Sequence, residues 1–148
     1  MQKQENRPDL HISGFTLIEV LVVVVILGIL AAVVVPRVMD QPDKAKVTKA
    51  KADVNSLVTA LNIYRLENGQ YPSTNQGLQA LVSRPSGQPE AANWKVGGYV
   101  DRLPLDPWGN EYQYLSPGVN AEIDVYSLGS DNALGGEGLA SDVGNWNR

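Results

Sequence analysis

An uninterrupted apolar run occupies residues 15–35, where almost every side chain is Val, Leu, Ile or Ala. A helix of about 20 apolar residues spans a bilayer, so the run predicts a membrane-spanning helix that ends near Pro36. Gly28 and Pro36 are its expected breaking points, because glycine lacks a Cβ and proline cannot donate to the Ala32 carbonyl. Glu19 lies near the start of the run, and a carboxylate there requires a partner.

A second pattern follows the apolar run, in which apolar residues recur at steps of three and four. This period places them on one face of a helix. The members of this apolar stripe are Val47, Ala50, Val54, Leu57, Leu61 and Tyr64. Lysines occupy the other faces, and Asn68-Gly69 supplies a left-handed stop. Residues 37–68 therefore predict an amphipathic helix whose apolar face packs on the rest of the chain.

Shorter patterns occupy the remaining part of the sequence. Residues 111–115 and 123–128 alternate as strands do, and Pro and Gly residues between them indicate a turn. A short helix is expected over residues 76–82, with Ser73 or Thr74 as its cap. Together the patterns predict an α+β fold, in which a long N-terminal helix packs on a small antiparallel sheet.

Charge and composition narrow the function. The 148 residues carry a net charge of −4, which is unevenly distributed. Basic residues outnumber acidic ones over residues 37–65, whereas Arg148 is the only base from residue 103 onward. The acidic C-terminal part of one copy of the chain can therefore attract the basic residues 37–65 of another copy. The absence of cysteine excludes disulfides and thiolate metal sites. His11 is the only histidine and no catalytic motif is present, so we expect a protein that is not an enzyme.

Three interpretations of residues 1–36 follow from the residues alone: a conventional signal peptide, a permanent membrane anchor, or a precursor cut on the polar side of its apolar run. A conventional signal needs a basic start and a shorter apolar stretch. Here Lys3 and Arg7 are offset by Glu5 and Asp9, which disfavours that interpretation.

Residues 14–23, with the sequence Gly-Phe-Thr-Leu-Ile-Glu-Val-Leu-Val-Val, resemble the class III signal of type IV pilins and type II secretion pseudopilins. The resemblance implies that a prepilin peptidase cuts after Gly14 and methylates the new amino-terminal Phe15. It also implies that Glu19 recruits the Phe15 amine of the next subunit. A positive amino terminus would lower the desolvation cost of this carboxylate. The alternative to such a partner is that Glu19 lies at the depth of the lipid headgroups and reaches water.

Three further segments resemble the type II secretion major pseudopilins, the core protein G family: residues 71–78, 103–109 and 144–146. This resemblance implies a pilin-like fold with a calcium-bound C-terminal loop. It divides the chain into a cleaved leader, a transmembrane and filament-core half of the helix, an amphipathic half of the helix and a globular periplasmic head, at residues 1–14, 15–36, 37–68 and 69–148.

The C-terminal segment, residues 128–146, is rich in glycine and acidic residues and has little to bury. A loop of this length needs something to order it. Calcium prefers carboxylate and carbonyl oxygens, but composition alone leaves a metal site and a solvated acidic loop both open. The resemblance implies a calcium ion bound by the carboxylates of Asp131 and Asp142. It also implies main-chain carbonyl ligands from Leu128, Ala133 and, as a weaker candidate, Ser130. Glu137 is the alternative carboxylate.

The resemblance also implies a function. The chain is expected to form a helical homopolymer through open-ended contacts, and the growing filament is expected to drive folded proteins across the outer membrane. The implied partners are minor pseudopilins, the inner-membrane secretion platform and the prepilin peptidase, with no nucleic acid. A type IV pilin for adhesion, motility or DNA uptake is the first alternative, and a monomeric calcium-binding receptor anchored in the membrane is the second.

The location of the head is the one point on which charge and resemblance disagree. Lys and Arg residues follow the apolar run, which by the positive-inside rule favours a cytoplasmic head. The resemblance implies a single-pass protein of the bacterial inner membrane with its head in the periplasm, and a periplasmic filament after assembly. We take the periplasmic head as the expectation.

Overall fold

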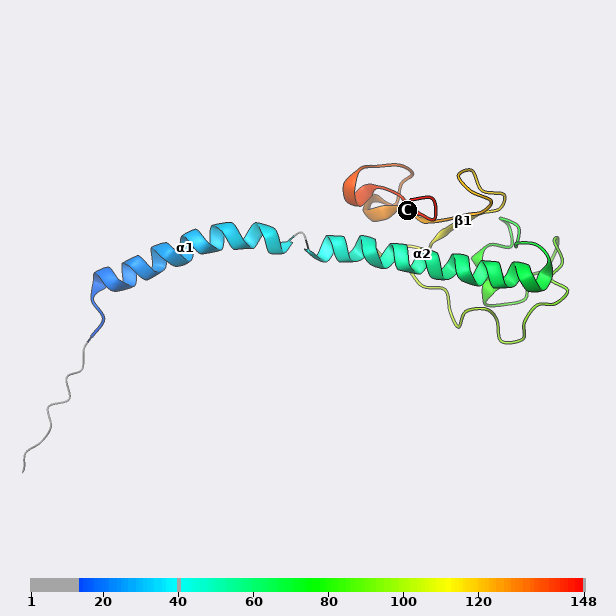
Figure 1. The fold of residues 1–148 in the computed structure, drawn as a ribbon, viewed down its shortest axis with the longest axis horizontal. Helices are drawn as coiled ribbons and strands as arrows, with labels where there is room; N and C mark the ends of the chain where they lie inside the picture. The colour runs from blue at the N-terminus through cyan, green and yellow to red at the C-terminus, as the bar shows by residue number, and fades with distance from the viewer. Residues whose placement is uncertain (1–13, 40, 148) are drawn as a thin grey trace, which may run out of the picture. The chain divides into compact units, whose positions relative to one another are not determined.

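The computed structural model describes residues 14–39 and 41–147, and these belong to two units, residues 1–40 and 41–148. Residues 1–13 of the expected leader lie outside the described residues. The first unit contains helix α1, Leu17–Met39, and the second begins with helix α2, Gln41–Asn68 (Figure 1). The expected long helix is therefore described as two helices, with Asp40 between them outside the described residues.

Helix α1 continues through Gly28 and Pro36 and ends at Met39 in the single chain, while local melting between these two residues in a filament stays a prediction. A proline inside a helix removes one backbone donor, and the residues on either side keep their own helical hydrogen bonds. Among the residues that the structure describes, no helix has both the length and the apolar character needed to cross a membrane.

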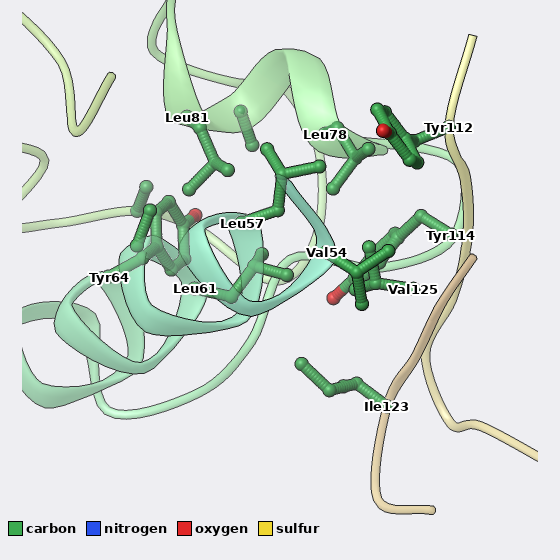
Figure 2. Close-up of a cluster of buried hydrophobic side chains, with 13 residues drawn as sticks. Val54, Leu57, Leu61, Tyr64, Leu78, Leu81, Tyr112, Tyr114, Ile123 and Val125 are labelled. Carbon is green, nitrogen blue, oxygen red and sulfur yellow. The ribbon is translucent and has the colours of Figure 1, made fainter. Parts of the chain in front are cut away.

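Helix α2 carries the core of the second unit. Most members of the predicted stripe are buried: Ala50, Val54, Leu57, Leu61 and Tyr64. The remaining member, Val47, is half-buried. Val54, Leu57, Leu61 and Tyr64 pack against Leu78 and Leu81 from the following segment and against Tyr112, Tyr114, Ile123 and Val125 from the sheet region (Figure 2). The helix ends as predicted, because Gly69 has a φ of 83° and its N–H donates to the Arg65 carbonyl at 2.7 Å.

The sheet has three antiparallel strands in the order β1-β2-β3: β1 Gln113–Leu115, β2 Asp124–Ser127 and β3 Val143–Gly144. Tyr114 pairs with Val125, and Tyr126 pairs with Gly144. The two predicted strands and the α+β class are confirmed. Strand β3 was not predicted, because two residues are too few to show alternation.

The segment between α2 and the sheet contains the 3-10 helix η1, Leu78–Leu81, which is shorter than the expected helix. Ser73 bonds reciprocally with Gln76, since the Gln76 N–H donates to Ser73 Oγ at 3.3 Å and the Ser73 N–H donates to Gln76 Oε1 at 3.0 Å. The N-cap of η1 is Gly77 and makes no side-chain cap bond, so the expectation that Ser73 or Thr74 caps this helix is wrong. The Thr74 hydroxyl donates to the Ser116 carbonyl and accepts from the Ser116 N–H, which ties this segment to the end of β1.

Candidate functional site

The expected processing and assembly residues lie at the start of α1. Phe15 is exposed, and Thr16 is the residue that caps the helix. The Glu19 N–H donates to Thr16 Oγ1 at 3.3 Å and to the Thr16 carbonyl at 3.1 Å, and the Val20 N–H donates to the same carbonyl at 3.2 Å. Glu19 therefore lies in the first turn, where the helix dipole favours a carboxylate. Both Phe15 and Glu19 are exposed and accessible to another chain.

The sequence reasoning did not assign a role to Thr16. The signal was present as Thr-x-x-Glu at residues 16–19, the capping-box pattern in which a hydroxyl satisfies the N–H of the third helical residue. This cap fixes the first helical residue at Leu17, only two positions after Phe15. The helix can therefore begin almost directly after the expected cut site.

The surface of α1 is apolar over most of the described length. Nearly every side chain from residue 15 to residue 30 is a large hydrophobic group that the structure leaves exposed: Phe15, Leu17, Ile18, Val20, Leu21, Val22, Val23, Val24, Val25, Ile26, Leu27, Ile29 and Leu30. An exposed apolar surface of this extent marks a region that contacts protein or lipid. The surface of α1 therefore requires a protein or lipid partner.

The C-terminal loop folds back on itself through two 3-10 helices, η2 Gly129–Asp131 and η3 Gly138–Ala140, which pack together. Gly136 lies so close to the opposite backbone that a Cβ there would be 2.2 Å from the Ala140 carbonyl oxygen. Asp142 closes the loop, because its N–H donates to the Gly135 carbonyl at 3.1 Å and its Oδ2 accepts from the Gly135 N–H at 3.0 Å.

The predicted calcium ligands come from both sides of this fold. Asp131 Oδ1 accepts from the Ala133 N–H at 3.1 Å, across Asn132 in the left-handed conformation. Asp142 Oδ1 is buried and has no hydrogen-bond partner among the described residues. A buried carboxylate oxygen without a partner is costly, and a cation would satisfy it. The loop therefore fits a hard cation at Asp142.

The donor set limits what kind of site this is. Among residues 14–39 and 41–147, no group of three or more His, Cys, Asp or Glu side chains is arranged to hold a metal ion. A cation would thus depend on the carboxylates of Asp131 and Asp142 together with main-chain carbonyls, which is a combination that calcium accepts. Of the other predicted ligands, Leu128 is half-buried and lies just before η2, while Ser130 and Ala133 are exposed. Glu137, the alternative carboxylate, is exposed and precedes η3.

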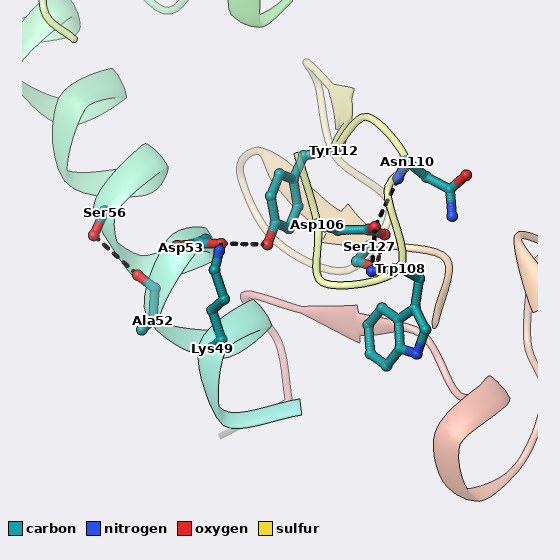
Figure 3. A network of polar contacts seen from close by, with 9 residues as sticks. All are labelled: Lys49, Ala52, Asp53, Ser56, Asp106, Trp108, Asn110, Tyr112 and Ser127. Atoms are coloured by element: carbon teal, nitrogen blue, oxygen red, sulfur yellow. Dashed lines mark hydrogen bonds and ion pairs between the residues drawn. The ribbon is translucent and has the colours of Figure 1, made fainter. Parts of the chain in front are cut away.

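A buried polar network lies beside the loop and was not predicted from the sequence (Figure 3). The Ser127 hydroxyl donates to Asp106 Oδ2 at 2.6 Å and accepts from the Gly129 N–H at 3.1 Å. In the same region the Tyr112 hydroxyl donates to Asp53 Oδ2 at 2.8 Å, and Lys49 pairs with that carboxylate. Burial, followed by the bond to Asp53, raises the pKa of Tyr112 far above its usual value.

Two family models match the chain. The model described as the prokaryotic N-terminal methylation motif matches residues 10–35, and the model described as protein G of the type II secretion system (T2SS) matches residues 37–146. The chain belongs to the type II secretion system protein G family. The resemblance inferred from the sequence is thereby confirmed, including the methylation motif around Gly14 and Phe15.

Relatives in this family are similar over nearly the whole chain. The type II secretion system core protein G of Pseudomonas aeruginosa is 59% identical over 134 residues, which are 90% of this chain and 94% of that protein. The protein of the same name from Vibrio cholerae is 56% identical over 135 residues, covering 91% of this chain and 92% of the relative.

A solved structure supports the same fold. The crystal structure of the major pseudopilin from the type 2 secretion system of enterohaemorrhagic Escherichia coli matches with a TM-score of 0.69 and 47% sequence identity. The match covers 78% of this chain and 98% of that chain. The expected pilin-like fold is therefore confirmed for this family member.

Proposed function

We propose that the chain is the structural subunit of the periplasmic pseudopilus of a type II secretion system, and that growth of this filament drives folded proteins across the outer membrane. The observation that carries the proposal is the protein G match over residues 37–146, directly preceded by a methylation motif over residues 10–35. The exposed apolar surface of α1 supports it, because bundled helices in a filament would bury that surface.

Processing would come before assembly. A prepilin peptidase cuts after Gly14 and methylates Phe15, and the Thr16 cap lets α1 begin beside the new amino group. Glu19 then accepts the positively charged amine of the next subunit, which offsets the cost of removing both charges from water. Minor pseudopilins and the inner-membrane secretion platform are the further partners of this step. Before assembly the subunit is held in the inner membrane by its apolar segment, with its head in the periplasm.

Calcium is part of the same proposal. Asp131 and Asp142 would supply carboxylates, and the Leu128 and Ala133 carbonyls would complete the site, with Ser130 or Glu137 as alternatives. The unpartnered, buried Asp142 oxygen supports this assignment. A bound cation supplies positive charge that holds the two acidic parts of the loop together, so its binding energy adds to the stability of the folded head.

The processing step is tested by the intact mass of the chain extracted from membranes with and without an active prepilin peptidase. We expect a chain that begins at Phe15 and carries one additional methyl group when the peptidase is active. A chain that still begins at Met1 would contradict the proposal.

Assembly is tested by substituting Glu19→Ala and measuring filament formation and secretion in cells that lack the native gene. We expect loss of filaments and of secretion, because the amine of the next subunit would have no carboxylate to bind. Glu90→Ala is the matched control, since Glu90 is an exposed head carboxylate whose loss leaves α1 unchanged. Lost surface pili with normal protein secretion in the deletion strain would instead indicate a type IV pilin.

A further inference from the structure

Ser127 stands at the end of β2 and connects two parts of the head through one hydroxyl group. The side chain is completely buried, with 0% of its surface exposed. Its hydroxyl donates to Asp106 and accepts from the Gly129 N–H, so both of its hydrogen-bonding capacities are used within the fold. Asp106 is buried as well, and its other oxygen, Oδ1, accepts from the N–H groups of Trp108 and Asn110 at 3.0 and 2.8 Å (Figure 3). The turn at residues 106–110 therefore holds the orientation of the Ser127 hydroxyl.

Gly129 is the residue at which the C-terminal loop turns toward its own return segment. Its φ is 72°, and a Cβ there would lie 2.9 Å from the carbonyl oxygens of Leu139 and Ser141. The position of Gly129 thus controls how closely η2 approaches the chain just before Asp142. Since Asp131 is the last residue of η2, the same contact controls how the two proposed calcium carboxylates are placed relative to each other.

We infer that Ser127 is a positioning residue for the calcium site: it fixes Gly129 so that Asp131 and Asp142 face one cation, while Ser127 itself does not bind the ion. This inference rests on the calcium site proposed above. A loop already held in its binding conformation loses less conformational freedom when the cation arrives. Residues that orient metal ligands from behind typically contribute about 10- to 100-fold to metal affinity.

A purely structural role for Ser127 makes a different prediction from a positioning role. Any buried hydroxyl with two hydrogen bonds stabilises the fold, so loss of stability alone does not separate the two roles. Tyr114 provides the matched comparison, because its buried hydroxyl donates to the Pro72 carbonyl at 2.8 Å from strand β1, on the side of β2 opposite β3. Removing either hydroxyl lowers stability, but only the Ser127 hydroxyl should affect the calcium Kd.

The experiment is calcium titration by isothermal calorimetry of the full chain in detergent micelles, after removal of metal with a chelator. We expect Ser127→Ala to raise the calcium Kd about 10- to 100-fold, and Tyr114→Phe to leave the Kd unchanged while lowering the melting temperature. If Ser127→Ala fails to fold, Asp106→Asn takes its place, because the amide removes the charged acceptor of the Ser127 hydroxyl.

A second measurement follows the metal-free protein directly. Hydrogen exchange of the Gly129 amide should be slow in the wild type and fast in Ser127→Ala, because the substitution removes the acceptor of that N–H. An unchanged Kd in Ser127→Ala, with calcium binding intact in the wild type, would overturn the positioning role alone. A wild-type chain that binds no calcium would overturn the calcium site and this inference with it.

Discussion

Gly97 and Gly98 are neighbours with similar backbone angles but different surroundings. Their φ values are 95° and 82°, which side chains rarely adopt. A Cβ on Gly97 would meet nothing within 4 Å, whereas one on Gly98 would lie 2.8 Å from the Leu81 carbonyl oxygen and 3.2 Å from that of Val82. Gly98 must stay small because its own segment bonds here, with the Tyr99 N–H donating to the Leu81 carbonyl at 2.7 Å.

We therefore expect alanine to be tolerated unequally at these two residues. Gly97→Ala should lower the free energy of unfolding by about 1–2 kcal/mol through backbone strain alone. Gly98→Ala should cost about 1–3 kcal/mol more, because the added methyl group collides with main-chain oxygens that cannot move aside. Urea denaturation of both variants of the full chain in detergent measures the difference, and equal losses would contradict the contact at Gly98.

Tyr114 is expected to make stability depend on alkaline pH. Burial raises the pKa of its phenol from 10.0 to about 12. The unfolded chain releases this proton first, so the stabilising contribution is complete below pH 10 and is lost as the pH rises toward 12. The free energy of unfolding should fall over this range, and it should fall less steeply in Tyr114→Phe. Parallel pH profiles for the two proteins would show that the Tyr114 phenol is equally protonated in the folded and the unfolded chain, and would contradict the prediction.

Secondary-structure elements differ in how well the sequence encodes them. Helix α2 could be predicted because its apolar residues repeat over several turns and its stop, Asn68-Gly69, is local. Strand β3 could not be predicted, because it is held by its pairing with β2 rather than by its own pattern, and η3 could not because its three residues are too few to show a pattern. The Asp106–Ser127 bond could not be predicted either, because it joins residues 21 positions apart. The motif at Gly14, Phe15 and Glu19 could be predicted, because its residues are close together in the sequence.

The two faces of α2 should respond very differently to the same truncation. Leu57 is 2% exposed and contacts the core, whereas Leu66 is 84% exposed. Leu57→Ala should lower the free energy of unfolding by about 2–5 kcal/mol, since it removes buried apolar groups and leaves a cavity. Leu66→Ala should change it by less than about 0.5 kcal/mol. Denaturant titration of the two variants tests the assignment of faces, and a large loss for Leu66→Ala would contradict it.

For the molecule as a whole, calcium is expected to determine how stable the head is. At free calcium 100 times above the Kd, binding would add about 2.7 kcal/mol to the free energy of unfolding. A calcium chelator should therefore lower the melting temperature of the full chain in detergent, followed by near-ultraviolet circular dichroism. Asp142→Asn should melt at the lower temperature with or without the chelator.

Asp101→Asn is the control for this experiment. It removes an exposed head carboxylate outside the C-terminal loop and should leave the chelator effect intact. A chelator that leaves the wild-type melting temperature unchanged would count against the calcium site, without affecting the family assignment.

All buried hydrophobic side chains of the described chain lie between Ala50 and Val143, within the second unit. We therefore expect the second unit to fold without the apolar helix that would join subunits together. Folding is then a first-order event of one molecule, while polymerisation depends on how many subunits are present. Assembly of the proposed filament should accordingly depend on the concentration of folded subunits, whereas folding of each subunit should not.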